Sequence, residues 1–107
     1  MIYPVRVTSA AWRDLKDIYD WIADNESLEK AGSVFDQLWE ATDSIAKLPQ
    51  RGSRPKELAF GIQPEYRQVF FKHYRVIYEV RREEVVIHLI ADGRRNLQSL
   101  LLRRLIG

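Results

Sequence analysis

The sequence predicts an α+β domain of the order β-α-α-β-β-β-α, with an α-helical hairpin packed on an antiparallel β-sheet. Apolar residues recur at helical spacing through the first half of the chain. Residues 66–92 are instead rich in Val, Ile, Tyr and Phe and are divided by short polar breaks. The length of 107 residues indicates one domain over 1–107, because two smaller cores would not be stable alone.

The first element is a short N-terminal strand. Residues 3–7 alternate and carry β-branched side chains, and Pro4 near their start favours an edge or first position. Thr8 or Ser9 can then cap a helix, because a side-chain oxygen at this point accepts an orphan backbone N–H. The amphipathic pattern that follows predicts a helix to about residue 24.

A second helix follows almost at once. Ser27 is its predicted cap, and Pro49 ends it. So short a link requires the two helices to lie antiparallel. Residues 49–65 hold the remaining prolines and predict a loop. The loop carries three basic residues near its start: Arg51, Arg54 and Lys56.

The last third of the chain predicts three strands and a helix. Residues 66–71, 74–81 and 85–92 are predicted to pair as an antiparallel meander, because the links between them are short. Asn96 can cap a closing helix over 96–106, whose leucines fall on one side.

The charges of the two halves differ in sign. Residues 1–48 hold five basic and nine acidic groups, whereas residues 49–107 hold twelve basic and six acidic groups. Ten of those twelve are arginines, whose planar guanidinium matches phosphate or carboxylate. The second half is therefore a candidate for an anionic partner, although arginines also occur on solvated sheet faces and helix ends.

Several classes of protein are excluded by composition. The absence of cysteine removes disulfide scaffolds, cysteine-based zinc sites and cysteine nucleophiles. No apolar run is long enough for a membrane span, and no signal-like segment opens the chain, so a cytoplasmic protein without membrane contact is expected. No metal-ligand spacing or glycine-rich phosphate loop is present, so no cofactor or metal is expected.

The order of elements, together with several short motifs, resembles the RelE/ParE superfamily of toxins, with the ParE-like branch closer. The resemblance covers nearly the whole chain. The motifs that carry it are Asp14-Leu15 with Ile18-Tyr19, the loop motif Leu48-Pro49-Gln50-Arg51-Gly52, the strand Tyr74-Arg75-Val76-Ile77-Tyr78-Glu79-Val80, and residues 85–90 followed by Gly93-Arg94-Arg95.

The resemblance implies the toxin of a type II toxin–antitoxin module. A cognate antitoxin would cover the sheet with a segment that folds on binding, giving a hetero-oligomer. RelE-like members cleave mRNA in the ribosomal A site, whereas ParE-like members inhibit DNA gyrase. The resemblance therefore leaves two functions open, a metal-independent endoribonuclease and a gyrase inhibitor, which differ in the residues that they require.

RNA cleavage without a metal needs proton-transfer groups as well as cations. Arg67, Arg75 and Arg95 match basic positions of RelE-like enzymes and could stabilise charge. RelE-like members place a tyrosine where this chain has Leu101, and other ribonuclease branches place a histidine where it has Asp92. Leu101 cannot move a proton, and Asp92 at an ordinary pKa is a poor acid at neutral pH.

Two histidines remain as candidates. His73 falls in a predicted turn, where a polar side chain is expected. His88 lies within the last strand, where alternation predicts that it shares a face with Val86 and Ile90, opposite Val85, Ile87 and Leu89. Both positions are commonly structural.

Five residues besides Arg75 are predicted to contact an antitoxin or target. Arg94 and Arg95 could bind nucleic acid, or they could pair with Asp92 and with acidic groups of an antitoxin. Leu97 and Leu101 either pack on the sheet or line a groove for an antitoxin helix. Trp21 lies on the flank of the first helix, and the resemblance to gyrase-inhibiting relatives implies that the helical hairpin takes part in toxicity.

These observations predict a growth-inhibiting toxin that binds DNA gyrase and blocks replication by binding rather than by catalysis. The alternative is a ribosome-dependent mRNA interferase that uses Arg67, Arg75 and Arg95 with Asp92 as proton acceptor. A third hypothesis is a family member without toxicity that retains antitoxin binding.

Overall fold

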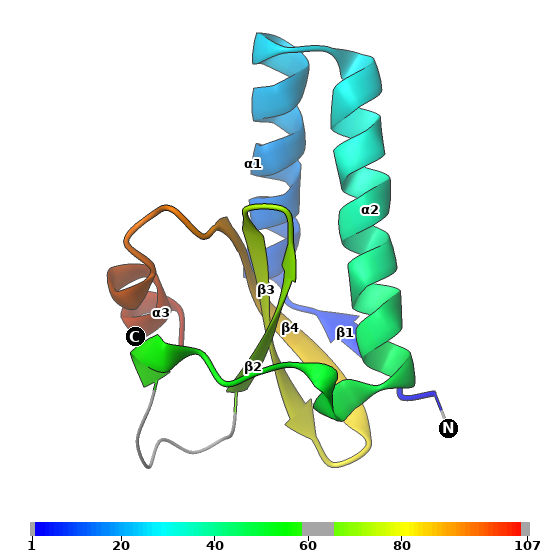
Figure 1. Cartoon of the computed structure of the whole chain (residues 1–107), viewed down its shortest axis with the longest axis vertical. Coiled ribbons are helices and arrows are strands. Elements are labelled where there is room, and N and C mark those ends of the chain that lie inside the picture. The colour runs from blue at the N-terminus through cyan, green and yellow to red at the C-terminus, as the bar shows by residue number, and fades with distance from the viewer. Residues whose placement is uncertain (1, 59–65, 106–107) are drawn as a thin grey trace.

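A computed structural model describes residues 2–58 and 66–105 and confirms the predicted order of elements (Figure 1). Residues 59–65, in the predicted loop, and Ile106, in the predicted closing helix, lie outside the described residues. The elements are β1 (Val5–Val7), α1 (Ser9–Asn25), α2 (Leu28–Lys47), the short 3₁₀ turns η1 (Pro49–Arg51) and η2 (Lys56–Leu58), β2 (Tyr66–Phe71), β3 (Tyr74–Arg81), β4 (Glu84–Asp92) and α3 (Leu97–Leu105).

The helical hairpin begins and turns at the predicted caps. The Thr8 hydroxyl accepts a hydrogen bond from the backbone N–H of Ala11 at 3.1 Å, and the Ser27 hydroxyl accepts one from Lys30 at 3.0 Å. These bonds satisfy donors that the first turn of each helix leaves without a partner. α1 and α2 run antiparallel and extend past the end of the sheet (Figure 1).

The four strands form one mixed sheet in the order β1-β4-β3-β2. The β2-β3-β4 meander is antiparallel, as predicted. β1 differs, because it pairs in parallel with β4, with Val5 opposite Val85. β1 occupies an edge, the position that Pro4 favours.

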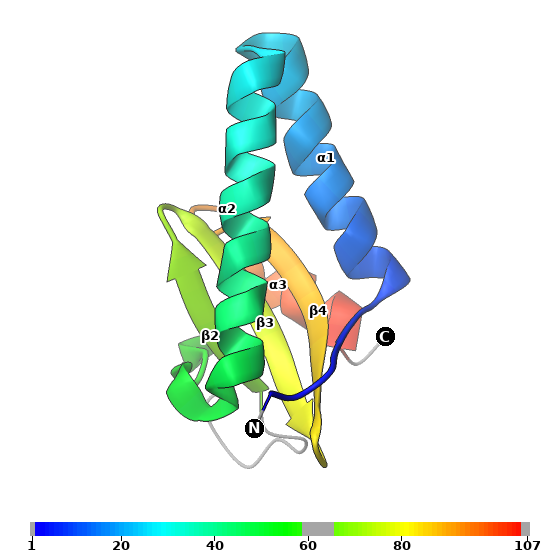
Figure 2. The ribbon, with the colours of Figure 1, turned by 90° about the vertical axis from the view of Figure 1, so that its right-hand side faces the viewer.

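Both faces of the sheet are covered. The α1–α2 hairpin lies on one face, and α3 lies on the other (Figure 2). Side chains such as Leu15, Leu38 and Tyr78 form the larger core under the hairpin. Leu97 and Leu101 are 2% and 0% exposed and form the smaller core under α3. No described helix combines the length and apolar character that a membrane span requires.

A β-bulge interrupts the pairing of β3 with β4. Ile87 lies opposite Tyr78, but Leu89 lies opposite Ile77, so His88 is an extra residue on β4. The alternation predicted for this strand is therefore wrong beyond His88, because an inserted residue turns the following side chains over. Ile90 joins Val85 and Ile87 in the core under the hairpin, whereas Leu89 packs under α3.

An ion pair closes the edge of β4 where β1 ends. The Arg104 guanidinium contacts the Asp14 carboxylate at 2.8 and 3.0 Å, and it donates to the carbonyl oxygen of His88 at 2.8 Å. The Asp14 carboxylate also accepts the N–H of Ile90 at 3.0 Å. Side chains of α1 and α3 thereby satisfy backbone groups that no strand pairs.

The hydroxyl of Tyr78 joins β3 to the loop after α2. Tyr78 is fully buried, and its hydroxyl donates to the carbonyl of Pro49 at 2.7 Å and accepts the N–H of Gly52 at 3.0 Å. Glycine is required at 52 by space, since a Cβ there would lie 2.5 Å from the Tyr78 oxygen. The Pro49-to-Gly52 motif is thus a turn that closes on one tyrosine.

Replacing Tyr78 by Phe is expected to destabilise the protein by about 1–3 kcal/mol, because the buried N–H of Gly52 and the partly buried carbonyl of Pro49 lose their partner. Urea unfolding measures this change. Tyr66→Phe is the matched control, because the Tyr66 hydroxyl makes no hydrogen bond to a described residue, and it should cost less than about 0.5 kcal/mol. Equal effects of the two substitutions would contradict the assigned role.

Candidate functional site

The main candidate site is an open depression of about 760 Å³ on the α3 side of the sheet. The loop after α2, strands β2 and β3, the β2–β3 turn and the connection from β4 to α3 surround it. We call it the basic depression. Its lining residues are Arg54, Lys56, Glu57, Gln68, Phe70, Lys72, His73, Arg75, Gly93, Arg94, Arg95, Asn96, Leu97 and Gln98.

The basic depression carries six basic side chains and one carboxylate, Glu57. Lys56, Lys72 and Arg95 make no ion pair with a described carboxylate. Cations that share a concave surface raise the local concentration of an anion. The arrangement therefore favours binding of an anionic ligand.

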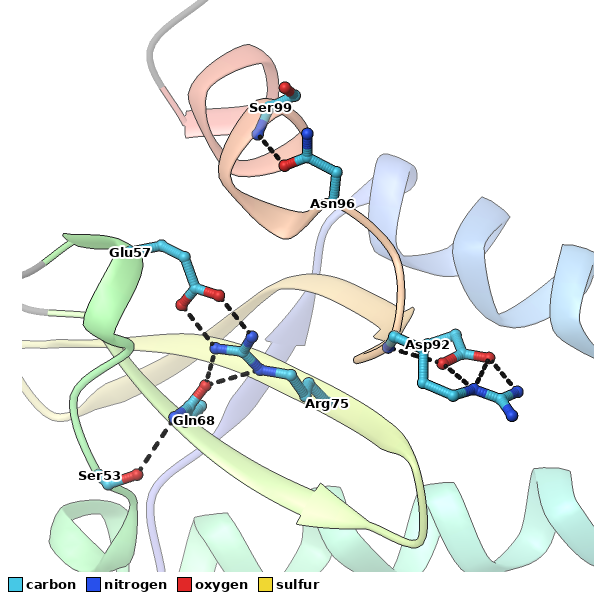
Figure 3. Close-up of polar contacts among 8 residues, drawn as sticks. Ser53, Glu57, Gln68, Arg75, Asp92, Asn96 and Ser99 are labelled. Carbon is cyan, nitrogen blue, oxygen red and sulfur yellow. Dashed lines mark hydrogen bonds and ion pairs between the residues drawn. The ribbon is translucent and has the colours of Figure 1, made fainter.

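Arg75 is a buried lining residue of the depression, and the side chains of Gln68 and Glu57 contact its guanidinium (Figure 3). Its Nε donates to the side-chain oxygen of Gln68 at 2.8 Å, and its two terminal nitrogens contact the Glu57 carboxylate at 2.8 and 3.0 Å. Gln68 is oriented in turn through its amide, which donates to the Ser53 hydroxyl at 3.4 Å. The hydrogen bond from Arg75 lowers the pKa of Glu57, so the ion pair is formed at neutral pH.

Gly93 provides the space for the Arg75 stem. A Cβ at this position would lie 3.0 Å from Cδ of Arg75 and 3.2 Å from the carbonyl oxygen of His73. The Gly93 N–H donates to that same carbonyl at 2.6 Å. The glycine that follows β4 therefore permits the β2–β3 turn and the start of the α3 connection to close around Arg75.

Arg94 and Asp92 form an ion pair at the rim. The Arg94 guanidinium contacts the Asp92 carboxylate at 2.6 Å, and the Arg94 N–H also donates to it (Figure 3). These hydrogen bonds lower the pKa of Asp92 to about 2. Nε2 of His73 lies 3.7 Å from the same carboxylate. A carboxylate with so low a pKa is a weak proton acceptor.

The structure brings together Arg75, Arg94 and Arg95 but not Arg67. Arg67 lies opposite Tyr78 on the hairpin side of the sheet and donates to the carbonyls of Gln50 and Gly52 at 3.2 and 2.7 Å. Arg67 thus supports the loop rather than lining the basic depression.

The apolar residues predicted to bind a partner have different fates. Leu97 and Leu101 hold α3 on the sheet. Their side chains therefore pack in the core and do not line an open groove in this structure. Trp21 is 61% exposed and lines a second cavity of about 720 Å³ between the hairpin and the end of the sheet. That cavity shares Arg94 and Arg95 with the basic depression, so Trp21 lies in a neighbouring part of one surface.

His88 lies away from the basic depression, whereas His73 lines it. Nε2 of His88 is 2.8 Å from the buried carboxylate of Glu79, and the imidazole contacts the Tyr66 ring edge-on. Burial raises the pKa of Glu79, but hydrogen bonds from His88 and Arg81 outweigh it, so the pKa is lowered overall. These contacts indicate that His88 stabilises the fold and does not belong to the basic depression.

The chemistry available in the depression is anion binding. Leu101 is buried and Asp92 is ion-paired, so neither position supplies the proton-transfer group that RNA cleavage would need, whereas His73 is the imidazole among the described lining residues. Among the residues that the structure describes, no three His, Asp or Glu side chains gather in a metal-binding arrangement.

Sequence reasoning did not identify Glu57 and Gln68, which hold Arg75. One signal for Glu57 is present, because it is the first acidic residue in a loop whose other charged residues, up to that point, are basic. No local pattern marks Gln68, because its contact with Arg75 depends on the register of β2 and β3.

Comparison with known proteins gives a family match and several solved structures of similar fold. The family model described as "ParE toxin of type II toxin-antitoxin system, parDE" matches residues 5–97. The chain is similar to a chain of the chromosomal ParDE system from P. aeruginosa, with a TM-score of 0.70 and 19% identity, covering 85% of this chain and 96% of that chain.

It is also similar to the E. coli toxin RelE, solved in the free state as a double arginine-to-alanine mutant. The TM-score is 0.61 and the identity 16%, covering 99% of this chain and 100% of that chain. No curated protein matches the sequence. At these identities the two solved structures establish a common fold.

Asp92 is expected to titrate near pH 2 rather than near 3.8. Because the pKa is lower in the folded state, the stability that Asp92 contributes is present above about pH 4 and is lost as the pH falls through about 2. Carbon-detected NMR of the carboxyl group measures the midpoint. Arg94→Gln should return it toward 3.8, and a midpoint that this substitution leaves unchanged would contradict the assigned cause.

Proposed function

The chain belongs to the ParE toxin family of type II toxin–antitoxin systems, and we propose that it inhibits growth by binding DNA gyrase. The toxin would block the gyrase–DNA complex without cleaving nucleic acid, and a cognate antitoxin would neutralise it. Its site of action would be the cytoplasm, where replication takes place.

The observation that carries this proposal is the chemistry of the basic depression. It combines six cations with few groups that can transfer a proton. The RelE-type tyrosine position is Leu101, which is fully buried, and the Asp92 carboxylate is paired with Arg94. The described residues of this site can bind an anionic surface, but neither Leu101 nor Asp92 supplies the acid or base that RNA cleavage requires.

Arg95 is the residue best placed to contact the target. It is exposed, it makes no ion pair with a described residue, and it lines both the basic depression and the cavity beside Trp21. Arg94 and Trp21 extend the same surface. Arg75 is buried beneath Glu57 and would act through the shape and charge of the depression.

The proposed antitoxin partner is supported by the family and by the likeness to a ParDE system. A segment that folds on binding could cover both cavities, because they are adjacent. The chain would take part in a toxin–antitoxin hetero-oligomer as a single domain, residues 1–107.

A second candidate function is ribosome-dependent mRNA cleavage. The presence of His73 among the cations of the depression favours it, because histidine is the side chain that most often serves as general acid or base. In this alternative Arg75 and Arg95 would stabilise charge on the phosphate, and Arg67 would support the loop.

We expect the purified chain to inhibit supercoiling of relaxed plasmid by gyrase, with no cleavage of mRNA on translating ribosomes. Arg95→Gln should raise the concentration needed for half inhibition about tenfold, because one charge-assisted contact is lost. Arg13→Gln is the matched control, since Arg13 is an exposed arginine on α1 outside both cavities. Full supercoiling in the presence of excess chain would exclude gyrase binding, and cleaved transcripts would establish the ribonuclease alternative.

A further inference from the structure

We infer that Arg75 is a carboxylate-binding position for an acidic protein segment, and that Glu57 is an internal competitor occupying this position in the free chain. A partner would bind by exchanging one of its own carboxylates for that of Glu57. The inference rests on the proposed antitoxin or target only for the identity of the partner, because the position itself is described by the chain alone.

The geometry of Arg75 separates an inner edge from an outer one. Gln68 takes the inner edge by accepting from Nε at 2.8 Å and from one terminal nitrogen. Each terminal nitrogen carries two N–H groups, so both can also donate to the Glu57 carboxylate, at 2.8 and 3.0 Å. This is the forked arrangement that guanidinium and carboxylate adopt together. Gln68 and Glu57 reach the guanidinium from different sides (Figure 3), so we expect Gln68 to keep Arg75 in place when Glu57 is displaced.

Glu57 is held less firmly than Arg75. It lies on the three-residue turn η2, and among other described residues its carboxylate bonds only to Arg75. Its side chain is 14% exposed, against 7% for Arg75, so it covers the guanidinium from the solvent side. Rotation of this one side chain would expose the outer edge of Arg75 without a change in the sheet.

The cations around Arg75 favour a ligand that carries several carboxylates. Lys56, Lys72 and Arg95 line the same depression without a described carboxylate partner. A ligand with several carboxylates could pair with these cations while one carboxylate replaces Glu57. A ligand with one negative charge would gain little, because it would only exchange one ion pair for another.

The lining favours an acidic protein segment over a nucleic acid. Single-stranded nucleic acids are bound by aromatic rings on which bases stack. Phe70 is the exposed aromatic ring of the described lining, and the Arg75 guanidinium already lies 5.7 Å from its centroid. The depression thus offers forked and point charges for carboxylates, but little surface for bases.

The test measures binding of a fluorescein-labelled decaglutamate peptide by fluorescence anisotropy at low salt. Glu57→Gln should bind the peptide at least about threefold more tightly than the parent chain, because the competitor loses its charge. Glu83→Gln is the matched control, since it makes the same change in net charge at an exposed turn outside the depression. It should change the affinity by less than about 1.5-fold, because exposed charges at a distance are screened.

Arg75→Lys tests whether the forked guanidinium is required. Lysine keeps the charge but cannot form two parallel hydrogen bonds with one carboxylate. In this background Glu57→Gln should give no more gain than Glu83→Gln. Glu57→Asp, which keeps the charge but shortens the side chain, should give an intermediate gain and serves if Glu57→Gln does not fold, as checked by thermal unfolding.

The inference is overturned if Glu57→Gln binds the peptide no more tightly than Glu83→Gln, or if the gain persists unchanged with Arg75→Lys. A labelled ten-nucleotide thymidine strand is the second probe, and an equal or larger gain for this strand would overturn the choice of a protein partner. None of these measurements contains gyrase or antitoxin, so their result is independent of the supercoiling assay.

Discussion

The hydroxyl of Tyr78 is the constraint on which the arrangement of the candidate site depends. Tyr78 belongs to the buried stretch of β3, residues 75–79, and its hydroxyl fixes the turn from Pro49 to Gly52 against the sheet. Ser53 follows this turn directly and pairs with Gln68 of β2. This pairing positions the following loop residues, so that Glu57 lies over Arg75. The Tyr78 hydroxyl thus helps to determine where the charged side chains of the loop lie.

The opposite charges of the two halves of the sequence become two separate surfaces in space. The hairpin carries most of the acidic residues and covers one face of the sheet, whereas the basic depression opens on the other face. The pair of Asp14 with Arg104 connects the two halves at the edge of β4. A partner that covers both surfaces must therefore present different charges to each.

Local signals account for the elements that were predicted correctly. Thr8, Ser27 and Asn96 cap helices, and Pro49 ends α2, because these effects involve only neighbouring residues. The bulge at His88 was missed because alternation assumes an uninterrupted ladder, and the parallel pairing of β1 because it depends on distant residues. In the site, the adjacent Arg94 and Arg95 are visible in the sequence. That Arg67 and Arg75 lie on different faces of the sheet follows only from the register of β2 with β3.

The contacts of Asp14 with β4 and α3 have a consequence for the order of events during synthesis. Asp14 contacts residues that lie 76 and 90 positions later in the chain. Contacts of such separation close large loops, and they form late because the entropy of closure precedes any gain from packing. The nascent hairpin can form early, but the sheet edge and the depression await the last strand and α3. The basic depression is therefore complete only after β4 and α3 have been translated.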